Sequence, residues 1–292
     1  MKRFLDKPRG LPASALLSAL LATLVSTAAP SASAGTLYNG WNYAIDSFRD
    51  GSGGPAYEEL GLAYRQVGNT GYFAISGGMP LAGVANSGAR NGSIAPGDLF
   101  LNFSNHALNT QASFQNDPGV FAIRFASAND SLGNTGTNPN PTLGVFGSLN
   151  VVSLSTQNVG YATLQDYWNA GFNVQPQMGD LGTQAAVQGY LGNGTMYANI
   201  STGTQLAGIT SLDATALAAL GLDFPHFGAA GSQIFGFSFN RSLLPSGDFT
   251  AHFLEECIND GIALTVGHEA PEPGTLALLG LALAGVPLRR RR

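Results

Sequence analysis

The sequence predicts an all-β fold, an antiparallel β-sandwich of jelly-roll-like type with one or two short helices. Apolar residues alternate with polar ones in several segments, 39 glycines divide the 292-residue chain into short pieces, and only two stretches resemble helices. The alternating apolar positions are Leu99, Leu101 and Phe103, then Phe121, Ile123 and Phe125, and then Phe235, Phe237 and Phe239. Such strands have one buried and one more hydrated face, and Phe100 and Asn102 are expected on the hydrated one.

Two β-hairpins are predicted where strand-like segments flank turn residues. Residues 60–67 return as residues 72–76 through a Gly-Asn-Thr-Gly sequence, and residues 248–258 return as residues 262–266 through an Asn-Asp-Gly sequence. The Asp-Gly pair in the second turn is one of the strongest short hairpin signals.

The two predicted helices lie in the connections between strands. Residues 163–170 begin with Thr163 as a capping residue, and residues 213–220 begin with Asp213 before several good helix formers. Residues 129–141 are polar and rich in turn formers, which predicts a long surface loop.

The N-terminus has the three parts of a secretory signal peptide. Basic residues come first, an uncharged apolar stretch over residues 11–25 follows, and Ala32 and Ala34 fit the small-residue pattern of signal peptidase, with cleavage before Gly35. The alternative is an N-terminal membrane anchor. The stretch is short for a membrane span and the cleavage pattern follows it directly, which favours a signal helix that is removed.

The C-terminus contains a second apolar segment between two conspicuous motifs. Pro271, Glu272 and Pro273 precede the uncharged residues 274–288, and the chain closes on four arginines, Arg289, Arg290, Arg291 and Arg292. A helix over the uncharged residues is about 22 Å long, so it spans a membrane only if the flanking arginines reach toward the surface. The arginines are expected to stay cytoplasmic and everything before the tail to face outward. An ordinary tail anchor is the alternative.

This order of motif, apolar segment and basic cluster resembles the PEP-CTERM sorting signal of Gram-negative bacteria. The resemblance implies recognition by exosortase, a membrane protease-transpeptidase, while the C-terminal helix transiently anchors the chain in the inner membrane. It also implies removal of the tail and transfer of the protein to the cell surface or an exopolysaccharide matrix.

The expected organisation is therefore a signal peptide over residues 1–34, an extracellular β-sandwich over residues 35–268 and a sorting tail over residues 269–292. Both lysines lie in the signal peptide, and 16 of the 18 acidic side chains lie between residues 35 and 270. The cations of that part are Arg49, Arg65, Arg90, Arg124 and Arg241. This charge balance excludes a basic patch for nucleic acid, and the lack of lysine excludes a Walker-type phosphate loop.

The central part also resembles an exosortase-dependent surface-protein family of unassigned activity. The segments that carry the resemblance are LYNGWNYAIDSFRDGSGG, YEELGLAYRQVGNTGYFAISGGMPLAG, GDLFLNFS, FGFSFN and HFLEECINDGIAL. This resemblance implies no catalytic residues.

Cys257 is the only cysteine, which excludes an intrachain disulfide and cysteine-type zinc sites. The predicted strand places it on the same face as Phe249 and Phe253, as a small buried residue, with His252 on the opposite face. A nucleophilic role is the alternative, and it would need a histidine beside the thiol. The four histidines show no metal-ligand spacing.

Acidic residues raise two further hypotheses. The pairs Glu58-Glu59 and Glu255-Glu256 suggest glycoside hydrolysis, but neighbouring strand residues point to opposite faces and each pair would need a distant partner. Asp46 and Asp50 are weak calcium candidates, because residues 46–51 resemble half of a calcium-binding loop. Asp98, Asp130 and Asp260 also lie in predicted turns. A structural Ca²⁺ is one interpretation, and solvated turn acids are the other.

The sequence predicts a non-enzymatic, exported surface or matrix protein. Its expected partners are signal peptidase, exosortase, the membrane before the tail is removed, and exopolysaccharide. The first alternative is a lectin-like carbohydrate-binding module that presents Trp41, Tyr43, Tyr167 or Trp168 for stacking on sugars. The contrary interpretation is that these aromatic side chains fill the core. A glycan-active enzyme is the third hypothesis.

Overall fold

The computed structural model describes residues 35–48, 50–104, 106–170 and 177–267. The chain divides into two compact units, residues 1–32 and residues 33–292, and the first lies outside the described ranges. The signal helix and the C-terminal helix predicted above also lie outside them. Within the described ranges, no helix combines the length and apolar character needed to cross a membrane.

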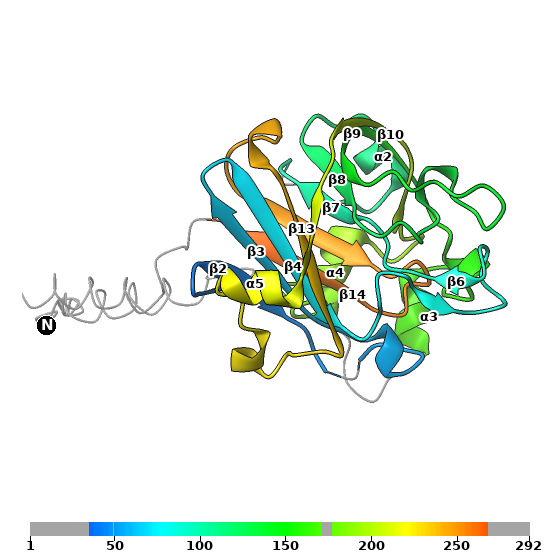
Figure 1. Ribbon diagram of the computed structural model, residues 1–292. Coiled ribbons are helices and arrows are strands. Elements are labelled where there is room, and N and C mark those ends of the chain that lie inside the picture. Colours follow the sequence, from blue (N-terminus) through cyan, green and yellow to red (C-terminus); the bar gives the residue numbers. More distant parts are fainter. Residues whose placement is uncertain (1–34, 49, 105, 171–176, 268–292) are drawn as a thin grey trace, which may run out of the picture. The chain divides into compact units, whose positions relative to one another are not determined.

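The described part of the second unit is built mainly from antiparallel strands in two six-stranded sheets (Figure 1). The first sheet has the order β1-β2-β3-β4-β12-β11 and the second the order β10-β9-β8-β7-β13-β14. The first contains β1 (Thr36–Tyr38), β2 (Trp41–Ile45), β3 (Glu59–Val67), β4 (Thr70–Gly77), β11 (Thr210–Asp213) and β12 (Gln233–Asn240). The second contains β7 (Leu99–Asn102), β8 (Val120–Arg124), β9 (Gly144–Val152), β10 (Asn199–Ala207), β13 (Phe249–Leu254) and β14 (Gly261–Val266). A small ladder pairs β5 (Val84–Ala85) with β6 (Ser93–Ile94).

The two large sheets share one hydrophobic core, as a sandwich requires. Phe73 and Phe237 enter it from the first sheet, and Leu101, Phe249 and Phe253 enter it from the second. Phe73 and Phe249 meet edge to face, with ring centroids 6.4 Å apart. The buried faces predicted from the alternation are confirmed, because the alternating apolar residues of all three segments belong to this core or, for Phe103 and Phe121, pack against it.

The strand order differs from that of a jelly roll. Consecutive strands β1 to β4 are neighbours in one sheet and β7 to β10 are neighbours in the other, and each meander gains two strands from later in the chain. A jelly roll is instead made of two Greek keys. Local hydrophobic periodicity identifies strands but does not specify which distant strands pair, so this part of the prediction was wrong.

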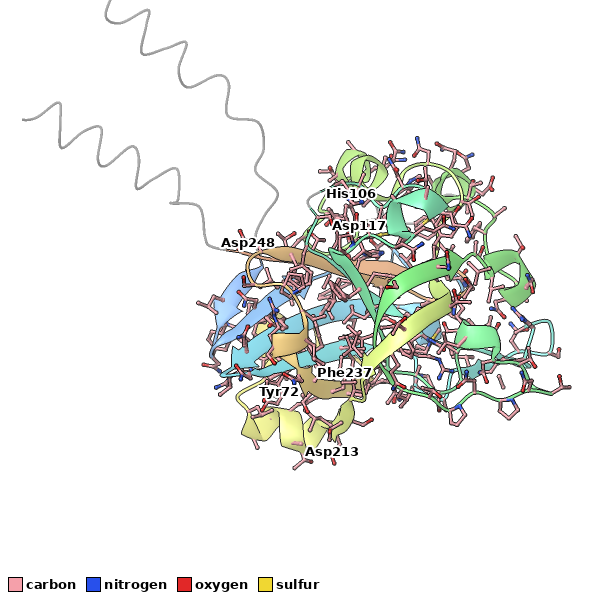
Figure 2. The ribbon with its side chains drawn as sticks, turned by 90° about the horizontal axis from the view of Figure 1, so that it is seen from above. Tyr72, His106, Asp117, Asp213, Phe237 and Asp248 are labelled. Carbon is pink, nitrogen blue, oxygen red and sulfur yellow. The ribbon has the colours of Figure 1, made fainter. Side chains whose placement is uncertain are left out.

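The outer faces of both sheets are also covered, which the prediction of hydrated faces missed. Helix α5 (Ala214–Ala219) lies on the first sheet (Figure 1). Its Leu217 belongs to one buried hydrophobic cluster with Trp41 and Tyr43. Tyr72 of β4 packs toward this outer layer, whereas Phe237 of the neighbouring strand packs between the sheets (Figure 2). On the second sheet, Phe114 of α2 (Gln111–Phe114) packs against the fully buried Phe100.

Within the described ranges, the two helices predicted between strands are present, and two others were missed. α3 (Leu164–Asn169) and α5 begin where predicted, with the side chains of Thr163 and Asp213 as caps. Helices α2 and α4 (Gln184–Leu191) were not predicted, although Thr183 caps α4 in the same way. Short 3-10 turns are η1 (Pro55–Tyr57), η2 (Ser131–Gly133), η3 (Ser155–Asn158), η4 (Phe224–Phe227) and η5 (Arg241–Leu243).

The first predicted hairpin is correct, and β3 returns as β4 around Gly68 and Asn69. In the second hairpin, β13 ends at Leu254, so residues 255–260 form a longer turn instead of continuing the strand. The predicted surface loop over residues 129–141 also needs correction. Its first residues, Asn129, Asp130 and Ser131, are buried, because they form hydrogen bonds inside the domain.

Candidate metal centre

Three aspartates that are distant in sequence come together in the structure. Asp46 directly follows β2, Asp50 lies in the next loop, and Asp260 lies in the turn between β13 and β14. One carboxylate oxygen of each lies within 4.8 Å of the others, and all three residues are buried. In the described ranges, no other group of three His, Cys, Asp or Glu side chains meets this criterion. Asp46 and Asp50 are the two sequence candidates for calcium.

Backbone amides hold one oxygen of each aspartate in place. The amide of Gly179 donates to Asp46 Oδ1 at 2.8 Å, and the amide of Gln177 donates to Asp50 Oδ2 at 2.8 Å. A segment far from both aspartates in the sequence thus orients their carboxylates.

Asp260 is held in the same manner from two sides. The amide of Glu59 donates to Asp260 Oδ2 at 2.7 Å, and the amide of Gly261 donates to Asp260 Oδ1 at 2.8 Å. Because Glu59 begins β3, these contacts join the first sheet to the β13–β14 turn.

Two carboxylate oxygens of the centre have no partner. Asp46 Oδ2 and Asp50 Oδ1 are buried without a hydrogen bond, although leaving a buried polar group unsatisfied costs about 1–3 kcal/mol. In the part of the chain that the structure describes, no salt bridge involves Asp46, Asp50 or Asp260. The geometry therefore leaves two buried carboxylate oxygens without a hydrogen-bond donor or a salt-bridge partner among the described side chains.

Further carboxylates surround the three aspartates. Glu59 and Glu255 are buried, and their Oε2 and Oε1 atoms, respectively, lack hydrogen-bond partners. Glu255 Oε2 accepts a hydrogen bond from the Cys257 thiol at 3.5 Å. The three aspartates thus lie inside a wider cluster of acids. The sequence analysis treated the glutamates of this cluster only as members of separate pairs.

Burial and mutual repulsion shift the titration of these acids. Burial, followed by the charge of Asp50, raises the pKa of Asp46 well above its usual range. Burial, followed by the charge of Glu58, raises the pKa of Asp50 to about 7. The pKa of Asp260 is also raised, first by burial and then by Asp46, Asp50 and Glu255. A cation among these groups would oppose all of these shifts, because it favours the charged carboxylates.

A surface groove lies beside the centre. The groove has a volume of about 700 Å³, and its lining includes Phe48, Gly51, Glu58 and Gly78. A Cβ atom added at Gly51 would lie 3.0 Å from Asp260 Oδ2, which shows how closely the groove approaches the aspartates. Glycine at this position therefore keeps the backbone close to the carboxylate without crowding it.

Asp98 and Asp130, the other turn acids considered above, belong to a different network. Asn129 Nδ2 donates to Asp98 Oδ1 at 2.9 Å, and Ser131 Oγ donates to Asp98 Oδ2 at 2.5 Å. Asp130 Oδ2 accepts from Asn158 Nδ2 at 3.0 Å. Asp98 is thus satisfied by protein donors on both oxygens.

Glu256 joins this second network, whereas Glu255 faces the metal centre. The two Glu256 oxygens accept hydrogen bonds from Asn199 Nδ2 at 2.9 Å and from the amide of Ala95 at 3.1 Å. Glu255 and Glu256 were expected to point in opposite directions from a strand. They do belong to different networks, but both lie in the turn after β13. Neither glutamate is exposed to a surface where it could contact a polysaccharide.

Cys257 is buried, as expected, but in a different place. It lies in the β13–β14 turn and packs with Met79, Ala89 and Ile94, not on a strand face with Phe249 and Phe253. Burial, followed by the charge of Glu255, raises the pKa of the thiol well above its usual value. These surroundings disfavour the thiolate that a nucleophile requires.

The aromatic residues proposed as sugar platforms are mostly internal. Trp41, Tyr43 and Tyr167 are fully buried, and Trp168 is partly buried against the cluster around α3 and α4. Tyr167 donates from its hydroxyl to the carbonyl oxygen of Asp50 at 3.1 Å. The core interpretation is therefore correct for the first three residues.

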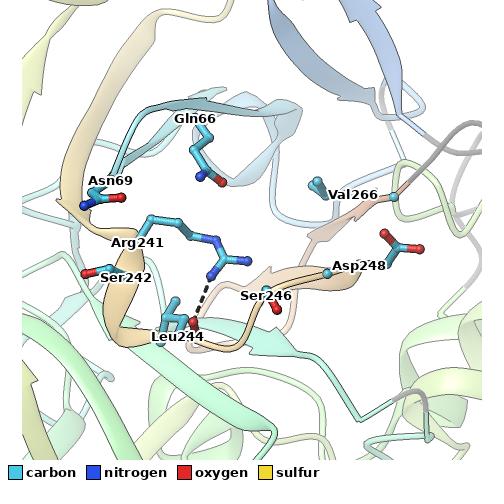
Figure 3. A pocket seen from close by; sticks show the side chains of 10 residues that line it. Gln66, Asn69, Arg241, Ser242, Leu244, Ser246, Asp248 and Val266 are labelled. Atoms are coloured by element: carbon cyan, nitrogen blue, oxygen red, sulfur yellow. Dashed lines mark hydrogen bonds between the residues drawn. The ribbon is translucent and has the colours of Figure 1, made fainter.

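A second pocket, separate from the acidic cluster around Asp46, Asp50 and Asp260, is lined by Arg241 (Figure 3). It has a volume of about 550 Å³ and is lined partly by Gln66, Asn69, Ser246 and Asp248. The Arg241 guanidinium donates from Nη1 to the Leu244 carbonyl at 3.1 Å, and it lies over the ring of Phe103, 5.1 Å from the centroid. Sequence reasoning did not find this pocket, because its walls come from three separate segments.

The residues predicted for processing lie almost entirely outside the described ranges. These are Ala32 and Ala34 at the signal cleavage position, the Pro271, Glu272 and Pro273 motif, and Arg289, Arg290, Arg291 and Arg292. Gly35 is described, and its amide donates to the Thr265 carbonyl of β14 at 3.2 Å.

Comparison with known protein families identifies a match at the C-terminus. Residues 269–292 match the family model of the PEP-CTERM protein-sorting motif. No curated relative and no solved structure shows significant similarity to the chain. The matched segment contains the Pro-Glu-Pro sequence, the apolar stretch and the arginine cluster. The chain therefore carries a PEP-CTERM sorting signal at its matched C-terminal segment, and this motif implies export and exosortase-dependent sorting to the cell surface.

Proposed function

We propose that this chain is a non-enzymatic structural protein of the surface or extracellular matrix of a Gram-negative bacterium, associated with exopolysaccharide. The observation that carries the proposal is the position of the sorting motif. The last strand of the folded domain, β14, ends at Val266, and the matched motif begins at residue 269. A cut near Pro271, Glu272 and Pro273 would thus release the whole β-domain and remove only the tail.

The export steps complete this proposal. Signal peptidase would cleave after Ala34, and the apolar residues 274–288 would then hold the chain in the inner membrane until exosortase acts. The four terminal arginines would remain on the cytoplasmic side, because positive charges favour that side of the membrane.

The burial of the acids supports a structural role over an enzymatic one. A glycosidase needs two carboxyl groups on either side of a bound sugar. Asp46, Asp50, Glu59, Glu255 and Asp260 are all buried, and the aspartates are held by backbone amides. A polysaccharide chain would need open access to two of them.

The test follows the protein in a Gram-negative host that has exosortase, beside the same host with the exosortase gene deleted. Intact mass and peptide mapping of the surface and matrix fractions should show an N-terminus at Gly35 and no peptide from residues 276–292. In the deletion strain the tail should remain and the protein should stay with membranes. A matrix protein that keeps its tail in the host with exosortase would contradict the proposal.

A second function, sugar binding, is favoured by the Arg241 pocket instead of by the aromatic residues named above. The pocket offers amide, hydroxyl, carboxylate and guanidinium groups, and its size is typical of small-ligand sites. Affinity electrophoresis in gels that contain the host's own exopolysaccharide should show retardation that Gln66→Ala and Ser246→Ala reduce. Gln188→Ala, on α4, is the matched control. Equal mobility of all proteins with and without polysaccharide would exclude this function.

A further inference from the structure

We propose that Asp46, Asp50 and Asp260 bind one calcium ion, which ties the loop after β2 to the β13–β14 turn. This site is independent of the sorting motif and of the function proposed above. Its ligands come from two segments that are far apart in sequence, and a third segment orients two of them through the amides of Gln177 and Gly179.

The geometry fits a single ion. Calcium binds oxygen at about 2.3–2.6 Å, so two oxygens on opposite sides of one ion lie about 4.6–5.2 Å apart. The donor oxygens of the three aspartates lie within 4.8 Å of one another. This spacing is compatible with one ion shared by the three carboxylates, with small side-chain adjustments where a pair lies at the upper end of that distance.

Unsatisfied oxygens are the second observation that points to a ligand. Asp46 is 5% exposed and Asp50 is 0% exposed, and Asp46 Oδ2 and Asp50 Oδ1 have no hydrogen-bond partner. Their other oxygens already accept backbone hydrogen bonds. Asp46 and Asp50 thus each have one oxygen fixed by the protein and one left for a cation, whereas Asp260 would bind through an oxygen that also accepts a backbone hydrogen bond.

The donor set favours calcium over other metals. All three side chains offer oxygen, which suits hard cations such as Ca²⁺ and Mg²⁺, whereas zinc prefers nitrogen and sulfur. The Cys257 thiol donates a hydrogen bond to Glu255, and the His252 ring stacks on Phe100. Magnesium usually retains several water molecules in strict octahedral geometry, whereas calcium accepts irregular oxygen cages. A buried site made of protein oxygens therefore fits calcium better.

The surrounding charge would strengthen binding. Glu59 and Glu255 lie beside Asp260, so ionisation of the whole group places like charges close together, and the aspartates have no salt bridge within the described ranges. A divalent cation would replace this repulsion with attraction.

The experiment uses the mature protein as secreted, stripped with EDTA and dialysed. Calcium alone in millimolar excess should raise the melting temperature by several degrees over EDTA, because a ligand that binds only the folded state stabilises it. Magnesium at the same concentration should give a smaller shift. Isothermal titration should give one calcium per chain.

Terbium, a luminescent substitute for calcium, gives a readout that does not depend on stability. The Tyr167 hydroxyl bonds to the Asp50 carbonyl at 3.1 Å, so excitation of tyrosine should sensitise bound terbium, and calcium should displace it. Asp46→Asn and Asp260→Asn should weaken terbium binding at least tenfold. Asp213→Asn is the matched control, because Asp213 is an exposed cap of α5 and asparagine also caps helices.

The outcomes separate clearly. Equal melting temperatures in calcium and EDTA, together with no sensitised terbium signal in the wild type, would overturn the proposal. An equal shift with magnesium would overturn the assignment to calcium. Variants that fail to fold would leave the wild-type titration and terbium measurements to decide.

Discussion

Arg124 Nε donates a hydrogen bond of 2.8 Å to Asn129 Oδ1, and both side chains are fully buried. The guanidinium also donates to the carbonyl oxygens of Thr142 at 2.6 Å and Ser127 at 3.1 Å. Asn129 in turn donates to Asp98 at 2.9 Å. One arginine thus anchors both ends of the polar segment between β8 and β9.

Arg124→Leu should destabilise the domain by about 3 kcal/mol or more, because it leaves the buried side-chain and carbonyl oxygens of Asn129 without their donor and removes a positive charge that acts on Asp98. Urea unfolding measures the loss. Limited proteolysis should also detect new cleavage within residues 125–142. Arg90→Leu, at an exposed position, is the control and should change stability little. A variant Arg124→Leu as stable as the wild type would contradict the role of the network.

Gly160 and Gly189 should respond in opposite directions to replacement by alanine. A Cβ at Gly160 would lie 1.8 Å from the Cys257 carbonyl oxygen, and this backbone atom cannot move without displacing the β13–β14 turn. Gly189 is exposed within α4, and a Cβ there would meet nothing within 4 Å. Gly160→Ala should therefore cost about 2 kcal/mol or more, whereas Gly189→Ala should gain up to about 1 kcal/mol. Thermal unfolding of both variants measures the difference, and the same sign for both would contradict the packing described here.

Acid should unfold the protein partly through His252. The ring stacks on Phe100 with a centroid distance of 5.4 Å, and burial lowers its pKa to about 3. The unfolded chain has the ordinary value of about 6.5, so the stabilising contribution is complete above that pH and is lost as the pH falls toward 3.

Removing this histidine should therefore reduce the sensitivity to acid. At pH 4 the contribution lost is about 3 kcal/mol, and His252→Gln should lose correspondingly less stability between pH 7.5 and pH 4 than the wild type. The Tyr190 hydroxyl, 3.3 Å from Nδ1, does not titrate in this range, because burial raises its pKa. Urea midpoints of both proteins at the two pH values provide the measurement. Parallel losses in the two proteins would show that His252 is not responsible.

The sequence predicted those elements whose signals are local. Thr163 and Asp213 accept hydrogen bonds from the amides of Asp166 at 3.1 Å and Ala216 at 2.8 Å, so these caps form as their residue types indicated. The Phe235-Phe237-Phe239 strand likewise followed from its alternation. What was missed depends on distant segments. β12 pairs with β4, and this pairing, which produces two meanders instead of a jelly roll, leaves no local signal.

The candidate metal centre shows the same limit. Asp46 and Asp50 are near each other in sequence and could be named together, but Asp260 joins them only because the β13–β14 turn lies against the start of β3. The burial of Trp41 and Tyr43 could not be predicted from the local sequence either, because α5 and η4 cover these residues on the outer face of the first sheet. The residue types alone indicated oxygen ligands for a cation, but only the tertiary structure shows which aspartates lie close enough to share one.

The sorting tail provides the last prediction, because it depends on charge and order along the chain. Moving each arginine to the membrane centre costs roughly 2.5–3.5 kcal/mol, so the cluster of Arg289, Arg290, Arg291 and Arg292 should keep the tail inside while exosortase cuts. Changing all four to serine should leave uncleaved precursor or let the tail slip outward, whereas changing them to lysine should preserve processing. Glu272→Ala should keep the orientation but impair cleavage. Mass spectrometry of surface and membrane fractions distinguishes these results. Recovery of residues 276–292 on most mature wild-type molecules would show a permanent anchor instead.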